Sequence, residues 1–533
     1  MGTWTVLAHP PGFAASTMLL LTDGTVMVNE DSSRRWFRLT PDSGGGYRNG
    51  TWSPLADAGV ARLYYDSAVL ADGRVLVMGG EYSDTSGTFS QNWTGTGEIY
   101  DPLTDTWSPT PAPPFASGAI GDAAACLLAD GRLLVGDVFS RSSAIYDPAT
   151  NTWSTTSSST YMSNEASWVL LQDGSVLSVT TYTPPQAERY IPASGIWASA
   201  GLTPDGLVDV PLKEFGPAVT LPDGRVFVVG GTGRTALYTA PSGGTGTGTW
   251  TAGPDVRDTD GTMMTAKDAP ACLLPNGRVL ILAGPAGAGG WSGASRFFEF
   301  DGTSNVRVAD AANAGGVTYV GRMLLVPSGE VLFTDGSSTV AVYTPDAGYD
   351  APWRPIITSC PTDVQLGQTF TLAGQQLNGL SQASVYGDDA QTSTNYPIVR
   401  AQNTTTGAVS YWRTANHSTM GIGTGAAPVS TTFTVPSTTD QGTYELVVIA
   451  NGIPSDAISV TVDAGSGQAS YLLLDRYIGG GAVLWAYASG AWHGKDVSDE
   501  DLAGIAQDLF AANRVDAYWS GAELTIARGW KNL

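Results

Sequence analysis

The chain of 533 residues is poor in positive charge, and this scarcity limits its partners. It contains 26 lysines and arginines against 49 aspartates and glutamates, so its formal net charge is −23. Binding to nucleic acid requires lysine and arginine side chains that neutralise phosphates, and docking to anionic membranes requires the same residues. The charge balance therefore argues against both kinds of partner.

Long apolar runs and a leader peptide are also lacking. No apolar run approaches the roughly 20 residues of a membrane-spanning helix. No signal peptide precedes the first strand-like segment, so we expect either a cytoplasmic protein or a mature form whose export signal is gone. Abundant glycine, serine, threonine and tryptophan are typical of extracellular proteins that handle polymers, which favours a secreted or cell-surface location.

Cysteine is scarce as well, with three in the whole chain. Cys126 and Cys272 occupy the same place in two sequence repeats, within apolar segments, and Cys360 stands alone in a linker. Three cysteines at these positions form no disulfide framework. The apolar surroundings of Cys126 and Cys272 predict buried, inert thiols.

A repeated hairpin phrase organises most of the chain. Residues 62–80 read R-L-Y-Y-D-S-A-V-L-A-D-G-R-V-L-V-M-G-G, which is an apolar run, an Asp-Gly turn, a second apolar run and a glycine pair. The turn glycine supplies the positive φ that a tight hairpin needs, and the flanking runs fit buried strands. Seven copies of the phrase begin at Leu19, Val69, Cys126, Val169, Val219, Cys272 and Leu324.

A second marker follows most copies and completes a four-stranded unit. It carries a tyrosine on a third strand and a tryptophan at the start of a fourth, as in A-I-Y-D-P-A-T-N-T-W, which ends at Trp153. Units of about 45 to 50 residues with this content predict kelch-type propeller blades. The seventh unit lacks its fourth strand, while residues 2–5 match residues 50–53. We therefore predict an all-β, seven-bladed kelch propeller over residues 1–350, closed by the N-terminal strand.

Two further domains are expected after the propeller. Residues 351–463 show short alternating β segments separated by turns, which predict one immunoglobulin-like β-sandwich. Residues 468–533 combine strand-like segments with a helical pattern whose N-cap is Ser498, which predicts a small α+β appendage.

The order of a kelch propeller and an immunoglobulin-like early-set domain resembles the galactose oxidase and glyoxal oxidase family of copper radical oxidases. The closest local match is A-R-L-Y-Y-D-S-A-V-L-A-D-G-R-V-L-V-M-G-G-E-Y, residues 61–82. By this resemblance Tyr64 takes the place of the copper-binding tyrosine that is cross-linked to a cysteine. Tyr82 takes the place of a stacking tryptophan, and Tyr319 that of the axial tyrosine.

The remaining positions of the family's copper site depart from its pattern. The cross-linking cysteine falls at Ala15, one histidine falls at Val320, and the other falls near Gln391. Copper(II) favours imidazole nitrogen, and two phenols with an amide do not hold it tightly. The chain is therefore expected to be a non-copper member of this scaffold.

The residues at the mouth of the propeller form the candidate site. Ligand sites on propellers lie where the innermost strands begin. The residue nine positions before each turn glycine is one candidate, which gives seven positions. Their sequence neighbours and the residues matched through the family resemblance are further candidates for the site. The candidate ligand-binding residues are Tyr64, Asp66, Tyr82, Asp122, Glu165, Glu214, Phe215, Asp268, Tyr319 and Gln391.

Three interpretations of these crowded carboxylates remain open. Mutual repulsion raises some pKa values and would allow acid–base hydrolysis of a glycosidic or similar bond. The carboxylates would alternatively bind a hard cation such as calcium through oxygen ligands. A third interpretation is structural, with the acids capping strands and being partly neutralised by Lys213 and Lys267.

The predicted function is binding of a carbohydrate or another polymer at this acidic and aromatic mouth, without catalysis. Flat aromatic rings stack on the C–H faces of sugars, and carboxylate oxygens accept hydrogen bonds from hydroxyl groups. One alternative is an enzyme at the same mouth, either a hydrolase or an oxidase of alcohols or aldehydes with copper or another metal. The other is a structural or assembly protein that uses the propeller and the C-terminal module as interaction surfaces.

Overall fold

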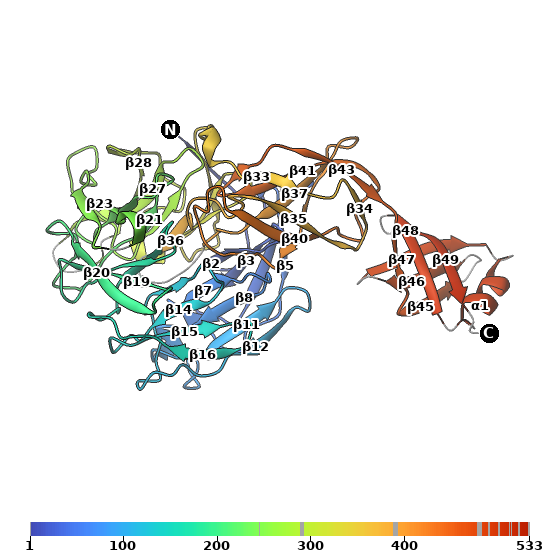
Figure 1. Cartoon of the computed structure of the whole chain (residues 1–533), viewed down its shortest axis with the longest axis horizontal. Coiled ribbons are helices and arrows are strands. Elements are labelled where there is room, and N and C mark those ends of the chain that lie inside the picture. Colours follow the sequence, from blue (N-terminus) through green and yellow to red (C-terminus); the bar gives the residue numbers. More distant parts are fainter. Residues whose placement is uncertain are drawn as a thin grey trace.

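The computed structural model describes residues 2–244, 246–287, 291, 293–386, 393–476, 482–488, 491–498, 501–510, 512, 514–520 and 523–530 (Figure 1). The described residues contain 49 β-strands, one α-helix and three short 3₁₀ helices at Ser242–Gly244, Thr318–Val320 and Ala351–Trp353. The prediction of an all-β chain is confirmed at this level. None of the helices among the described residues is long and apolar enough to cross a membrane.

The repeats fold into antiparallel sheets of four main strands, and the main strands of each sheet come from one repeat except in the seventh. The first contains β2 (Ala15–Leu20), β3 (Val26–Glu30), β4 (Trp36–Thr40) and β5 (Thr51–Pro54). The second contains β7 (Asp66–Val69), β8 (Val75–Met78), β11 (Gly97–Asp101) and β12 (Thr106–Pro109), beside a small sheet of β6 (Arg62–Leu63), β9 (Tyr82–Ser83) and β10 (Ser90–Gln91). The third contains β13 (Ala125–Leu127), β14 (Leu133–Gly136), β15 (Ser143–Asp147) and β16 (Thr152–Thr155).

The same pattern continues through the next repeats. The fourth sheet contains β17 (Ser167–Leu170), β18 (Val176–Val179), β19 (Gln186–Ile191) and β20 (Ile196–Leu202). The fifth contains β21 (Ala218–Thr220), β22 (Val226–Val229), β23 (Thr235–Thr239) and β24 (Thr249–Ala252). The sixth contains β26 (Pro270–Leu273), β27 (Val279–Pro285), β28 (Arg296–Phe300) and β29 (Asn305–Arg307), with β25 (Met264–Thr265) paired to β27.

The seventh sheet joins the two ends of the repeat region. It contains β30 (Arg322–Leu325), β31 (Val331–Thr334) and β32 (Ala341–Thr344), and β1 (Thr3–Val6) pairs antiparallel with β32. The strand β30 contacts both β26 and β2, so the seventh sheet lies beside the first. The pairing of the N-terminal segment that the match with residues 50–53 predicts is therefore present.

The tyrosine and tryptophan of the second marker explain how neighbouring sheets are held together. Tyr100 and Trp107 are directly opposite on β11 and β12, with ring centroids 5.1 Å apart. The Trp107 indole N–H then donates a hydrogen bond of 2.9 Å to the Ala56 carbonyl, which lies beyond the end of the first sheet. Trp153 makes the equivalent bond to the Pro111 carbonyl at 3.0 Å. Each outer tryptophan thus links its own sheet to the preceding repeat.

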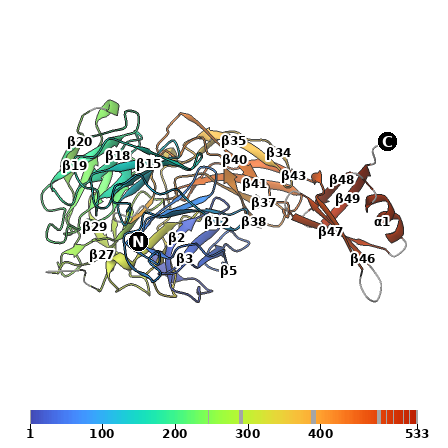
Figure 2. The ribbon, with the colours of Figure 1, turned by 90° about the horizontal axis from the view of Figure 1, so that it is seen from below.

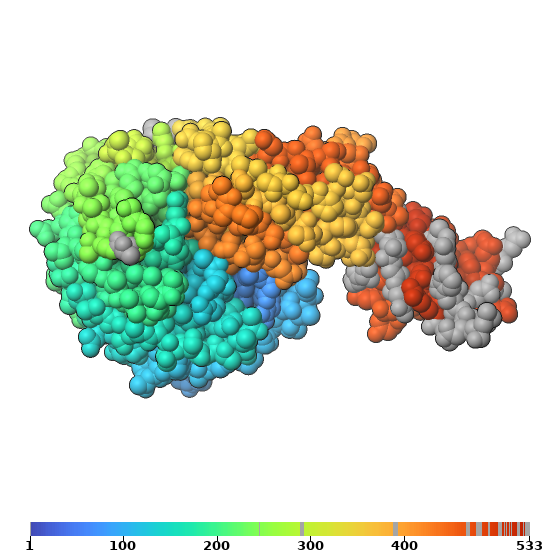
Figure 3. Space-filling view, in the orientation of Figure 1, coloured from blue at the N-terminus to red at the C-terminus, as the bar shows by residue number. Residues whose placement is uncertain are grey.

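The segment after the repeats forms two sheets. One contains β33 (Ile356–Ser359), β35 (Thr369–Gln375), β39 (Thr414–Ala415) and β40 (Pro428–Thr434). The other contains β34 (Asp363–Gln365), β37 (Ile398–Asn403), β38 (Val409–Trp412), β41 (Gly442–Ala450), β42 (Ile453–Pro454) and β43 (Ile458–Asp463). Figures 2 and 3 show this segment lying directly against the repeat sheets. The buried Tyr396 hydroxyl donates to the Leu20 carbonyl and fixes the contact.

One strand from this later segment enters the repeat sheets. The strand β36 (Ser384–Tyr386) pairs antiparallel with β26, the innermost strand of the sixth sheet. The Ser384 hydroxyl also accepts a hydrogen bond of 3.1 Å from the Leu325 backbone N–H of the seventh sheet. The pairing extends the sixth sheet inwards and brings Tyr386 to the centre of the molecule.

The C-terminal residues form a sheet of their own that projects from the rest of the chain (Figure 1). It contains β44 (Gly465–Gln468), β45 (Tyr471–Arg476), β46 (Ala482–Ala488), β47 (Ala491–Val497), β48 (Arg514–Ser520) and β49 (Glu523–Trp530). The helix α1 (Leu502–Phe510) precedes β48. The Ser498 hydroxyl, predicted as the N-cap, accepts a hydrogen bond of 3.2 Å from the Asp501 backbone N–H, and the helix itself begins at Leu502.

Candidate functional site

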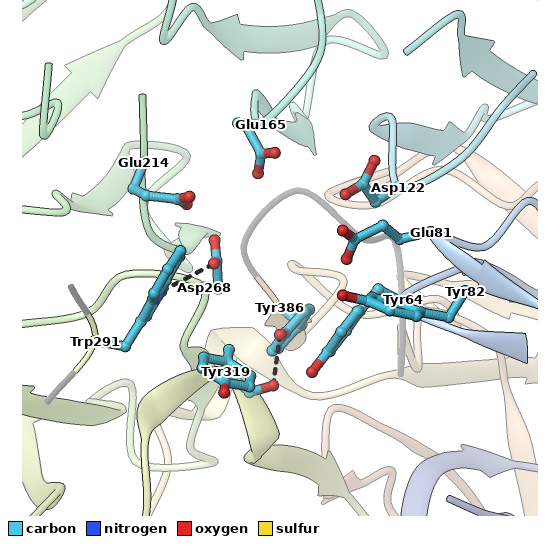
Figure 4. Close-up of a pocket in the computed structure, with 10 residues that line it drawn as sticks. All are labelled: Tyr64, Glu81, Tyr82, Asp122, Glu165, Glu214, Asp268, Trp291, Tyr319 and Tyr386. Carbon is cyan, nitrogen blue, oxygen red and sulfur yellow. Dashed lines mark hydrogen bonds between the residues drawn. The ribbon is translucent and has the colours of Figure 1, made fainter. Parts of the chain in front are cut away.

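A pocket of about 270 Å³ lies where the innermost strands of several repeat sheets begin (Figure 4). Carboxylates line one side and aromatic rings line the other. Seven of the ten residues predicted from the sequence line this pocket: Tyr64, Tyr82, Asp122, Glu165, Glu214, Asp268 and Tyr319. They come from different repeats, so the fold gathers residues that are up to 255 positions apart in the chain.

A recurring backbone conformation explains why the position nine residues before the turn glycine faces the pocket. Tyr64, Glu165 and Asp268 all occupy this position, and their φ angles are 53°, 55° and 42°. Residues other than glycine rarely adopt positive φ, because the Cβ atom crowds the backbone. The strain is local, and it recurs where the chain turns into the innermost strand of three different sheets.

Phe215 departs from this register and is a correction to the predicted site. Its side chain is buried in an apolar cluster with residues such as Val208 and Ala218, away from the pocket. In this repeat the residue with positive φ is Lys213, at 63°, which lies two positions before Phe215, where the count places it. The shift places the neighbouring Glu214 on the pocket in place of Phe215.

Two other predicted residues are not among those that line the pocket. Asp66 is buried within β7, opposite Met78. Gln391 lies outside the described residues. Lys213 also differs from the expectation that it neutralises the carboxylates, since its Nζ lies 4.0 Å from the centre of the Tyr182 ring.

The structure adds three lining residues that the sequence analysis missed: Glu81, Trp291 and Tyr386. Glu81 follows the glycine pair of the second repeat, and its backbone N–H donates to the Tyr64 carbonyl at 3.0 Å. Trp291 comes from the loop between β27 and β28, and Tyr386 arrives with β36. Two features of the sequence could have indicated these residues. Trp291 is a single tryptophan within a glycine-rich segment, and Glu81 stands directly before the predicted Tyr82.

Three of the carboxylates are close together. One oxygen from each of Glu165, Glu214 and Asp268 lies within 4.8 Å of the other two. The side chains of Glu214 and Asp268 are hydrogen-bonded to each other. Burial is the main cause that raises the pKa of Glu214, and the charges of Asp268 and Glu165 raise it further. The Trp291 indole N–H donates to Asp268 at 3.2 Å.

Asp122 is a fourth carboxyl group on the same side of the pocket. Only 9% of its surface is exposed, and its Oδ1 atom has no hydrogen-bond partner among the described residues. Burial raises the pKa of Asp122 to about 7, and the nearby carboxylate of Glu81 adds to the rise. Glu81 itself has a raised pKa, also chiefly because of burial. This side of the pocket therefore carries less negative charge at neutral pH than its number of acids suggests.

The aromatic side is a continuous series of ring contacts. The ring centroid of Tyr64 lies 6.1 Å from those of both Tyr82 and Tyr319, and Tyr319 lies 5.7 Å from Trp291. Behind this wall the buried Arg322 guanidinium lies 3.8 Å from the centre of the Tyr386 ring. It also donates to the Tyr319 carbonyl at 2.7 Å, which fixes the wall from behind. Arg322 therefore helps to hold Tyr386 and Tyr319 in position.

Comparisons with known proteins agree with the repeat pattern. A model of the Kelch motif matches residues 67–114. Galactose oxidase from Gibberella zeae is 43% identical over 61 residues, which are 11% of this chain and 8% of that protein. The chain carries a galactose oxidase-like kelch scaffold. Because the aligned part spans only about 8% of the length of that relative, the activity of the relative does not transfer with it.

Solved structures cover more of the chain at lower identity. A fungal alcohol oxidase of the AA5 family, in complex with copper, has a TM-score of 0.49 and 16% identity and covers 86% of this chain and 98% of its own. Virginiamycin B lyase from Staphylococcus aureus has a TM-score of 0.43 and 10% identity and covers 65% of this chain and 99% of its own.

The residues in the pocket do not fit the copper site that this family implies. Tyr64 and Tyr319 supply two phenols, but none of the three histidines of the chain lines the pocket. His417 is buried elsewhere and shares a hydrogen bond of 2.9 Å with the Thr431 hydroxyl. His493 stacks on Trp519 in the C-terminal sheet, with ring centroids 4.2 Å apart. The donor set is one of carboxylates and phenols, which suits hard cations and hydroxyl groups better than copper(II).

Proposed function

We propose that this chain is a binding protein that holds the end of a carbohydrate in the pocket described above. The observation that carries the proposal is the placement of five carboxyl groups opposite five aromatic residues around one cavity. Aromatic faces stack on the C–H faces of sugar rings, while carboxyl oxygens accept hydrogen bonds from hydroxyl groups. Few other neutral ligands present both kinds of surface on opposite sides.

The size of the pocket limits how much of a polymer enters it. Pockets for small molecules commonly have volumes of roughly 300–1,000 Å³, so a cavity of about 270 Å³ is at the small end of this range. It accommodates a small saccharide or one terminal unit better than an internal stretch of a long chain. Secretion or display on the cell surface would bring such a protein to its ligand, and the glycine-, serine- and threonine-rich composition supports that location.

We also propose that the scaffold works without the family's radical copper centre. The position of the cross-linking cysteine is Ala15, which is fully buried in β2, and the position of the axial histidine is Val320. Both changes remove the sulfur or nitrogen atom that the chemistry requires. The buried thiols Cys126 and Cys272 are free but lie on strands of the third and sixth sheets, and burial raises the pKa of each to about 12.

The architecture proposed around the pocket has three parts. The seven repeat sheets act as the blades of one closed propeller over residues 1–350, and the contact between the first and seventh sheets supports this closure. Residues 351–463 form the immunoglobulin-like domain, supported by their two facing sets of strands. Residues 468–533 form the separate appendage, supported by a sheet that pairs only within itself among the described residues.

A glycan array with matched variants tests the proposed function. Trp291→Ala removes an exposed ring from the pocket, and Trp492→Ala removes an equally exposed ring from the C-terminal sheet. We expect Trp291→Ala to weaken binding of the preferred glycan by roughly fivefold or more, because stacking contacts of this kind contribute about 1 kcal/mol or more. Trp492→Ala should bind as the wild type does.

Two results would contradict the proposal. If Trp291→Ala bound every glycan as tightly as the wild type, the ligand site would lie elsewhere on the molecule. If the wild type hydrolysed or oxidised its bound glycan, the pocket would be an active site, as the alternative enzymatic interpretation holds.

A further inference from the structure

Three carboxylates on one side of the pocket surround a common point. The oxygens of Glu165, Glu214 and Asp268 lie within 4.8 Å of one another. Calcium binds carboxylate oxygens at about 2.3–2.6 Å, so two ligands on opposite sides of the ion stand nearly 5 Å apart. The three oxygens therefore have the spacing of ligands to one ion. We propose that Glu165, Glu214 and Asp268 form a binding site for a calcium-sized divalent cation.

Two buried oxygen atoms point to a ligand that the protein itself does not supply. Glu214 is 6% exposed, and its Oε2 atom has no hydrogen-bond partner among the described residues. The Oδ1 atom of Asp122, on the same pocket, is in the same situation. A buried carboxylate oxygen without a partner loses its hydration at a considerable cost in free energy. A cation bound by the triad supplies the missing partner of the Glu214 Oε2 atom.

The lysines near the carboxylates face other groups. Lys267 forms an ion pair with Asp209, and Lys213 lies over the Tyr182 ring. Lys213 is therefore directed away from the triad, whereas Lys267 also acts on it, since its charge lowers the pKa of both Glu214 and Asp268. The triad thus brings three carboxyl groups together at the edge of an open cavity.

The chemistry of the site favours calcium over softer metals. All three side chains present oxygen, and neither histidine nor cysteine lines the pocket. Calcium accepts six to eight oxygen ligands in flexible geometry, so three carboxylates leave coordination positions for water or for hydroxyl groups of a ligand. Those remaining positions face the cavity, because the triad lies on one wall of it (Figure 4).

Calorimetric titration of the full chain, freed of metal with a chelator, tests the proposal with calcium chloride alone. We expect one saturable site per chain. Replacing one charged ligand with its neutral amide, as in Glu165→Gln, Glu214→Gln or Asp268→Asn, should weaken binding by about tenfold or more. Glu81→Gln removes a carboxylate from the same pocket but outside the triad, and it should weaken binding by less than about threefold.

Terbium luminescence locates the ion. Terbium binds oxygen sites of calcium size, and an indole close to it sensitises its emission. The Trp291 N–H lies 3.2 Å from Asp268, so Trp291→Phe should remove most of the sensitised emission while leaving the terbium affinity nearly unchanged. Trp492→Phe, in the C-terminal sheet, should leave the emission intact.

The proposal is overturned if calcium shows no saturable binding, or if the three amide variants bind calcium as tightly as the wild type. It is overturned equally if Trp291→Phe leaves the terbium emission unchanged, because the ion would then lie elsewhere. Each amide variant keeps the shape of the side chain it replaces, and its folding is checked by thermal unfolding. No carbohydrate is present in these experiments, so their failure and the failure of the proposed carbohydrate site are independent results.

Discussion

Asp122 is a buried acid that titrates close to neutral pH. Its pKa is raised to about 7, mainly by burial, whereas an aspartate in an unfolded chain has a pKa of about 3.9. The folded state therefore binds more protons than the unfolded state between these two values. The stability that depends on Asp122 is present below about pH 4 and is lost as the pH rises to about 7.

Asp122→Asn should remove this pH dependence. We expect the variant to exceed the wild type in free energy of unfolding by roughly 2–4 kcal/mol at pH 8, since each pKa unit corresponds to about 1.36 kcal/mol. The difference should disappear below about pH 3, where Asp122 is protonated in both states. Urea unfolding of both proteins at a series of pH values measures it. A constant difference at all pH values would show that Asp122 has an ordinary pKa.

Single residues show what the sequence could and could not predict about the site. Tyr64, Glu165 and Asp268 could be predicted by counting back from the turn glycine, because the same left-handed turn recurs in their repeats. The count failed at Phe215, where the left-handed residue is Lys213. Trp291 could not be predicted, because a loop rich in glycine has no period that fixes the direction of its side chains.

At the scale of elements, a buried ion pair supports the segment that leads to Tyr64. The Glu98 carboxylate, on β11, accepts hydrogen bonds from the backbone N–H groups of Gly59 at 2.6 Å and Val60 at 3.1 Å. It also pairs with Arg62 at 3.2 Å, and the side chains of both partners are less than one-tenth exposed. One carboxylate thus ties an irregular segment to the second sheet.

Glu98→Ala should destabilise the protein by about 3–5 kcal/mol, because it leaves the Arg62 guanidinium buried without its counter-ion. Glu30→Ala is the matched control. It breaks the pair between Glu30 and Arg35, whose side chain is 55% exposed, and should cost less than about 1 kcal/mol. Chemical unfolding followed by tryptophan fluorescence compares the two variants. Equal losses would show that burial does not govern the strength of these pairs.

The hairpins were predictable as elements, but the insertion of β36 was not. Each Asp-Gly or Asn-Gly turn fixes a local pairing of adjacent segments, and such pairing can be read from a few neighbouring residues. The strand β36 pairs with β26, more than 100 residues away in the chain. Nothing local in its three residues indicates that partner, and the place of Tyr386 in the pocket depends on it.

At the scale of the whole molecule, the N-terminal strand closes the repeat region. Trp4 on β1 packs between Phe297 of the sixth sheet, with ring centroids 4.5 Å apart, and Tyr343 of the seventh, at 4.8 Å. Its indole N–H donates to the Ala309 carbonyl at 2.8 Å. The sequence predicted this closure because residues 2–5 repeat the motif of residues 50–53, whereas the contacts of Trp4 with the sixth sheet emerge only from the packing.

Trp4→Ala should weaken the closure and lower the free energy of unfolding by about 2–4 kcal/mol, in line with the loss of a large, partly buried aromatic side chain. The freed edge of β32 should also promote aggregation on heating, because an unpaired strand edge is a template for pairing with another chain. Thermal unfolding combined with light scattering measures both effects, with Trp492→Ala as the control. A variant that melts and scatters like the wild type would show that β1 contributes little to closure.

The most direct measurement is a crystal structure of the protein bound to the glycan that it prefers on the array. We predict a sugar ring between the carboxylates and the aromatic wall, in contact with Trp291 and within hydrogen-bond distance of at least one of the carboxyl groups opposite it. A glycan bound on another face of the molecule, or a copper ion coordinated by Tyr64 and Tyr319 in the pocket, would contradict it.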